Sequence, residues 1–120
     1  MERALNAAAI RIPLMEIDDD LRGMLLSDKT RASAVISVHL FLRVGRHYQF
    51  RRGGEKVEMD EVVGKIVDAI WRVPETTLAE FGGQATRPRA AATDVIAREV
   101  FLGLSGAFEA VYVRKPNGGG

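Results

Sequence analysis

Apolar and polar residues alternate over one long stretch in the first half of the chain. Between residues 34 and 44, apolar or small side chains occupy every second position, and Ser37, His39 and Arg43 are among the residues between them. A period of two places successive side chains on opposite faces of a strand. The pattern therefore predicts a long strand over residues 34–44 with one face in the core.

The same alternation resumes after a break at Gly45 and Arg46. Tyr48 and Phe50 keep the parity of the core face, so we expect a bulge or a second strand here, with both aromatic side chains facing inward. Residues 52–55 contain two adjacent glycines and are predicted to form a turn.

A helical period follows this turn. Asp60 and Glu61 at its start and Arg72 at its end suit the helix dipole, and Pro74 ends the helix. Apolar residues recur at the spacing of one amphipathic helix face, at Met59, Val62, Val63, Ile66, Val67, Ile70 and Trp71. We expect this face to pack on the core side of the long strand, against Ile36, Val38, Leu40 and Leu42.

The amino-terminal segments show weaker patterns. A short helix over residues 2–10 is compatible with the helix formers there, but Pro13 disfavours a helical conformation at the residue before it. We therefore expect an extended piece over residues 13–17, followed by a turn at the acidic run 18–20. Residues 21–30 have no clean period and are assigned to a loop.

The carboxy-terminal third is predicted to be rich in strands. Residues 76–81 are compatible with a strand, whereas residues 91–104 fit either a helix row or a strand face. The Ser-Gly pair at 105–106 favours the strand, which would form a hairpin with residues 107–113. Residues 115–120 are expected to be a flexible tail.

These elements predict a single α+β domain over residues 1–120, in which one long amphipathic helix packs across an antiparallel sheet. The length of 120 residues suits one domain, and 47% hydrophobic with 28% charged residues is a globular composition. The lack of cysteine excludes disulfides, thiolate zinc sites and cysteine nucleophiles. No apolar stretch is long enough for a signal peptide or a membrane span, so we expect a soluble, intracellular protein that does not enter membranes.

The sequence contains no recognisable catalytic motif. A phosphate-binding loop, a nucleophile elbow and a paired-histidine motif are all absent. The acidic run 18–20 lacks the spacing of a calcium loop, and His39 and His47 would lie too far apart along a strand to share a metal. We expect neither an enzyme nor a cofactor.

The most suggestive polar cluster is basic. It interleaves with Tyr48 and Phe50 and contains Arg43, Arg46, His47, Arg51 and Arg52. Arginines mixed with aromatic residues can bind single-stranded nucleic acid by phosphate contacts and base stacking. Since both aromatic residues are expected to face inward, a solvated or subunit-contacting basic face is the simpler interpretation. The net charge of +1 adds no long-range attraction to nucleic acid.

The order of elements resembles the tail terminator, or tail completion, proteins of tailed bacteriophages. The resemblance rests on a strand entered through Pro13, the long strand 34–44, the helix 59–72 and a closing hairpin that ends at residues 108–113. It implies an α+β structural protein of the virion that forms a homo-oligomeric, hexameric ring. This ring would cap the tail tube at the head-tail interface and contact other tail or connector proteins.

A ring of this kind is expected to use the outward face of the long strand at the subunit contact or the lumen. Val35 and Phe41 are apolar although they lie on the face that should be exposed to solvent. His39 and Arg43 beside them offer directional polar contacts. Arginines near the lumen would also attract DNA phosphates without sequence preference. The candidate residues are Val35, His39, Phe41, Arg43, His47, Arg51 and Arg52.

A second resemblance rests on the end of the chain. Residues 111–117, Val-Tyr-Val-Arg-Lys-Pro-Asn, are similar to the closing strand and Lys-Pro-Asn of dihydroneopterin aldolases, enzymes of pterin metabolism whose tunnelling fold pairs a sheet with two helices. It implies a catalytic role for Lys115 and pterin binding by Glu80, although the amino-terminal His-Gly-Val segment of that family is absent. The two resemblances differ over residues 91–104, a strand in the first and a helix in the second.

Overall fold

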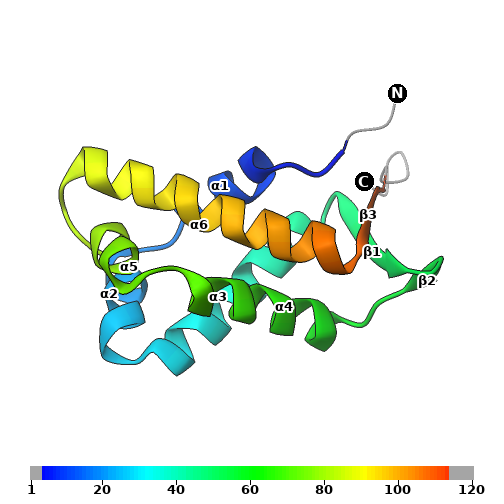
Figure 1. Cartoon of the computed structure of the whole chain (residues 1–120), viewed down its shortest axis with the longest axis horizontal. Helices are drawn as coiled ribbons and strands as arrows, with labels where there is room; N and C mark the ends of the chain where they lie inside the picture. The colour runs from blue at the N-terminus through cyan, green and yellow to red at the C-terminus, as the bar shows by residue number, and fades with distance from the viewer. Residues whose placement is uncertain (1–3, 114–120) are drawn as a thin grey trace.

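The computed structural model describes residues 4–113, and its fold is α+β but dominated by helices. Six helices hold 70% of the described residues, and a small three-stranded antiparallel sheet lies at one end of the molecule (Figure 1). The α+β class is therefore confirmed in its coarse form. The expected arrangement of one helix across a dominant sheet is wrong, because most of the predicted strands are helices.

The first two helices are α1 (Ala7–Met15) and α2 (Asp19–Ser27). Pro13 lies inside α1, so the prediction of an extended segment over 13–17 is wrong. Pro13 is buried along with Ile10 and Leu14, and this packing outweighs the local preference against a helix before proline. The loop predicted over 21–30 is also wrong, since the Asp18 side chain accepts a hydrogen bond from the Leu21 N–H at 2.8 Å and so caps α2.

The segment predicted to be the long strand is the larger part of helix α3 (Lys29–Val44). Residues 36, 40 and 44 lie four apart, so they satisfy both the strand period of two and the helical period of 3.6. Ser33 and Ser37 are buried beside Ile36 and Leu40 on this helical face, although a strand would have placed them on its outward side. The buried positions of α3 are Ala32, Ser33, Ile36, Ser37, Leu40 and Val44.

The sheet confirms the predictions for residues 48–55. Strand β1 (Tyr48–Arg52) pairs with β2 (Glu55–Lys56) on one side and with β3 (Glu109–Tyr112) on the other, all antiparallel. Tyr48 and Phe50 are buried as expected. Gly53 and Gly54 form the turn between β1 and β2 with φ values of 60° and 86°, which L-residues rarely adopt.

Replacing Gly54 with alanine is therefore expected to destabilise the protein by about 1–2 kcal/mol, because a Cβ atom is unfavourable at positive φ. The matched control is Gly64→Ala in the middle of α4, where a Cβ meets nothing within 4 Å. That change should be neutral or stabilising, since alanine favours a helix over glycine. Urea unfolding of both variants measures the difference, and equal stabilities would contradict the turn geometry.

Helix α4 (Met59–Arg72) begins and ends where the sequence predicts. Its expected packing on residues 34–44 is confirmed at Ile36 and Leu40, which are buried in the same core as Val62, Ile66 and Ile70. Leu42, Met59 and Trp71 are instead exposed, so the packing predicted for these three residues is wrong. The reason is that a helical α3 turns positions 40 and 42 to different sides.

The remaining predicted strands are helices α5 (Glu75–Phe81) and α6 (Thr86–Ala107). The strand favoured for residues 91–104 is wrong, and the alternative helix row through Ala92, Ile96, Val100 and Leu104 is the buried face of α6. Strand β3 confirms part of the segment predicted over 107–113, but it pairs with β1 rather than with the segment before it. Helix α6 crosses the molecule and packs on α1, α4 and α5 (Figure 1).

Candidate functional site

The predicted contact residues lie in four separate places. His39 and Arg43 are on the side of α3 that faces α1. The His39 Nε2 atom is 2.9 Å from the Pro13 carbonyl oxygen and 3.5 Å from Glu16 Oε1. Arg43 donates to the same Glu16 carboxylate. These contacts hold the end of α1 against α3.

Three further candidates belong to the sheet region. The exposed His47 ring stacks on Tyr112, with ring centres 6.5 Å apart. Arg51 donates to Gln49 Oε1 at 2.7 Å, and Arg52 forms an ion pair with Glu61 of α4. The hydrogen bond from Arg52 lowers the pKa of Glu61. The predicted basic cluster is thus divided among local partners.

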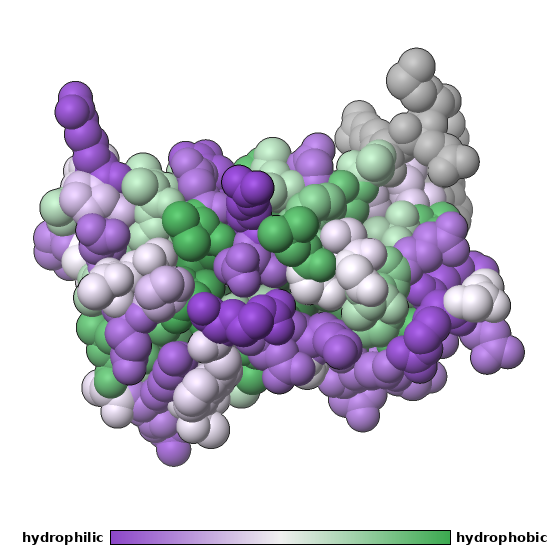
Figure 2. Space-filling view, viewed as in Figure 1, coloured by the Kyte–Doolittle hydropathy of each residue, from purple (hydrophilic) through white to green (hydrophobic). Residues whose placement is uncertain are grey.

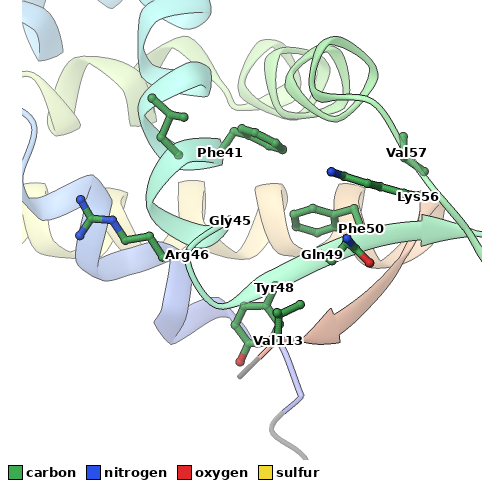
Figure 3. Close-up of a pocket in the computed structure, with 10 residues that line it drawn as sticks. Phe41, Gly45, Arg46, Tyr48, Gln49, Phe50, Lys56, Val57 and Val113 are labelled. Carbon is green, nitrogen blue, oxygen red and sulfur yellow. The ribbon is translucent and has the colours of Figure 1, made fainter. Parts of the chain in front are cut away.

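Phe41 lies beside an apolar pocket of about 420 Å³ at the junction of α3 and the sheet. Figure 3 shows Phe41, Phe50 and Lys56 around this pocket, with Arg46 extending away from Phe50 and Lys56. Phe50 packs edge-on against Phe108 with ring centres 6.2 Å apart, which fixes the sheet side of the pocket. The pocket has no acidic side chain in its lining.

The last candidate, Val35, is 47% exposed on the outer side of α3. It was expected on the outward face, and it belongs to an apolar surface whose other members were expected in the core. We call this surface the α3–α4 face and define it by Val35, Val38 and Leu42 of α3 and Met59, Val63 and Trp71 of α4.

The two helices present this face side by side. Val38, Met59 and Val63 line one shallow groove between α3 and α4. At the opposite end of the helix pair, the Trp71 Nε1–H donates to Ser33 Oγ at 3.1 Å. The buried positions of α4 are Val62, Ile66, Ala69 and Ile70, so the apolar stripe read from the sequence extends beyond the buried one at its Val63 and Trp71 edge.

Opposite charges flank the two ends of the α3–α4 face. Lys29 lies over the Trp71 ring, with its Nζ atom 4.3 Å from the ring centre, and Arg31 follows on α3. Glu58 and Asp60 border the groove at the other end. Asp28 pairs with Arg31 at 3.6 Å, so the Lys29 end of the face carries two basic groups and one acidic group, whereas Glu58 and Asp60 make the other end acidic.

The surface over α6 is different in character. In Figure 2, hydrophobic residues on the visible side form small separate groups between hydrophilic ones. Val95 and Leu102 are exposed on α6, and the exposed Arg98 lies between them in sequence. Scattered apolar residues of this kind are ordinary on protein surfaces.

Within residues 4–113, no group of three or more metal-ligating side chains is close enough to hold an ion. None of the described helices is both long and apolar enough to cross a membrane. Of the two residues implied by the aldolase resemblance, Glu80 is exposed on α5 and Lys115 lies outside the described residues. Residues 91–104 are helical, as that resemblance implies, but the described chain has six helices rather than two.

No known protein family, curated protein or solved structure matches this chain.

Proposed function

We propose that this chain is a structural assembly subunit that associates with copies of itself through the α3–α4 face. The observation that carries the proposal is the concentration of large exposed apolar side chains on two adjacent helices. Leu42 is 56% exposed and Trp71 is 48% exposed. Exposed apolar side chains gathered on neighbouring elements typically mark an interaction site.

The distribution of charge favours a second copy as the occupant. If two copies pair their α3–α4 faces about a two-fold axis with the helices antiparallel, Lys29 and Arg31 of one copy lie toward Glu58 and Asp60 of the other. A two-fold contact repeats each pairing twice, so both ends of the face are matched. The tryptophan at one end is a residue type enriched at interface hot spots.

A ring at the end of a phage tail would need a further head-to-tail contact at another surface, because a two-fold contact through the α3–α4 face by itself closes a dimer. Of the four elements on which that resemblance rests, the helix over residues 59–72 has the expected form. The segments at Pro13 and over residues 34–44 are helices, and the closing strand pairs with β1 and forms no hairpin with the segment before it. We therefore propose self-association as the function. In the tail-terminator form, the ring would in addition contact other tail or connector proteins and surround DNA.

The mass in solution tests the proposal. Wild-type protein should sediment as a multiple of the 13.2 kDa chain. Leu42→Asp should raise the dissociation constant by about tenfold or more, because it places an uncompensated charge in a desolvated contact. Leu102→Asp is the matched control, since Leu102 is 50% exposed on α6 and should leave the mass unchanged.

Charge exchange tests the antiparallel arrangement directly. Glu58→Arg and Arg31→Glu should each weaken association, and the double variant should recover much of the loss because the pair is restored with its signs reversed. Circular dichroism confirms that each variant is folded. A monomeric wild type at the highest soluble concentration would refute the proposal, and a lack of recovery in the double variant would exclude the two-fold antiparallel contact.

A further inference from the structure

A second pocket lies away from the α3–α4 face, among α1, α2, α5 and α6. Its volume is about 530 Å³, which is within the usual range for small-molecule sites. Helices α2 and α5 meet at the end of the molecule opposite the sheet (Figure 1). Three arginines line the pocket, Arg11 from α1, Arg22 from α2 and Arg89 from α6.

Arg22 is the central residue of this pocket and is only 8% exposed. Its guanidinium donates to the Ile17 carbonyl oxygen and to the Asp19 carboxylate, and it lies 5.9 Å from the centre of the Phe81 ring. Its Nε atom is buried and has no hydrogen-bond partner. A buried charge with an unsatisfied donor is costly unless further negative charge is supplied.

The acidic residues of the pocket do not balance its arginines. Arg22 and Arg89 share the single carboxylate of Asp19, to which Arg89 Nη1 approaches within 3.8 Å. Arg11 is held by Asp94 at 2.6 Å. Burial, followed by the charge of Arg89, lowers the pKa of Arg22, whereas the charge of Asp18 acts in the opposite direction.

The amino-terminal end of α6 adds to the positive potential. This helix has 22 residues, its first turn contains no acidic residue, and its N-cap Ala85 makes no side-chain hydrogen bond. The free N–H groups of a helix start attract anions, and here they belong to Thr86 and Arg87, because Pro88 has no N–H and the Arg89 N–H donates to the Ala85 carbonyl. Thr86 and Gln84 also line the pocket and offer a hydroxyl and an amide as neutral donors.

We infer that this pocket binds the phosphate group of a small organic molecule through Arg22, Arg89 and the start of α6. Arginine's planar fork suits phosphate, and a phosphate dianion would supply the negative charge that the two arginines lack. Met15 and Ala90 form exposed apolar parts of the wall, so the ligand is expected to carry an apolar body next to its phosphate.

Calorimetric titration with phenyl phosphate tests this inference, with inorganic phosphate and benzoate compared at constant ionic strength. We expect saturable one-to-one binding of phenyl phosphate, with weaker binding of inorganic phosphate, which lacks the apolar body. Arg89→Gln and Arg22→Gln should each weaken binding by about tenfold or more, because each removes a charged hydrogen bond. Arg98→Gln removes the same charge from an exposed position of α6 and should bind as wild type does.

Several results would overturn the inference. One is a lack of saturable binding of phenyl phosphate by the wild type, and another is an equal loss of affinity for it in all three arginine variants. Benzoate binding as tightly as phenyl phosphate would be a third such result. If Arg22→Gln does not fold, Arg89→Gln decides the outcome, because Arg89 is partly exposed. Leu42→Asp should bind phenyl phosphate unchanged, so this site and the self-association proposal fail independently.

Discussion

Replacing Ile66 with alanine is expected to lower the free energy of unfolding by about 2–5 kcal/mol. Ile66 is 1% exposed and lies on the buried face of α4, which packs between α3 and α6. Truncation removes the transfer free energy of the side chain and leaves a cavity that two helix neighbours restrict from collapsing. Urea denaturation followed by circular dichroism measures the loss.

Ile12→Ala is the matched control for this experiment. Ile12 is 58% exposed on α1, so the same chemical truncation removes little buried surface and should cost less than about 1 kcal/mol. If the two isoleucine variants lose similar amounts of stability, the assignment of the buried face of α4 is wrong.

Replacing Phe81 with alanine is expected to cost about 3–5 kcal/mol. Phe81 is 1% exposed at the end of α5 and is among the largest fully buried side chains of the described chain. Helix α5 is short, with seven residues and no side-chain cap, so its position depends on packing more than on its own helical stability. The change therefore removes the main anchor between α5 and its neighbours α2 and α6.

Phe101→Ala on α6 is the comparison for Phe81→Ala. Phe101 is only partly buried, so the loss should be clearly smaller than that of Phe81→Ala in the same thermal or urea unfolding experiment. A larger loss at Phe101 would show that α5 contributes little to the core. Phe81 also forms part of the arginine pocket, so a folded Phe81→Ala protein should bind phenyl phosphate more weakly.

The two proposed sites make different demands on the fold. Self-association requires only that α3 and α4 hold their outer side chains together, which their shared core ensures. The phosphate pocket requires four helices to converge, and one of its arginines is nearly buried. The pocket should therefore be the more sensitive of the two to core mutations, particularly in α5.

The sequence by itself determined the elements whose signals are local and consistent. Helix α4 combines a long apolar period with suitable charges at both ends and a following proline, and the structure has it at the predicted residues. The turn at Gly53 and Gly54, strand β1 and the inward direction of Tyr48 and Phe50 were predicted for the same reason. In each case the local backbone preference and the burial pattern agree.

Only the tertiary structure decided the secondary structure of segments whose apolar pattern fits two periods, or whose local backbone preference opposes their packing. Apolar residues four apart in α3 and α6 fit both the period of a strand and the period of a helix. Which of the two structures forms depends on the neighbouring elements that cover these residues. Pro13 is helical because its surroundings bury it. The arginine pocket joins residues from α1, α2 and α6 that no sequence spacing relates, since their proximity arises from helix packing alone.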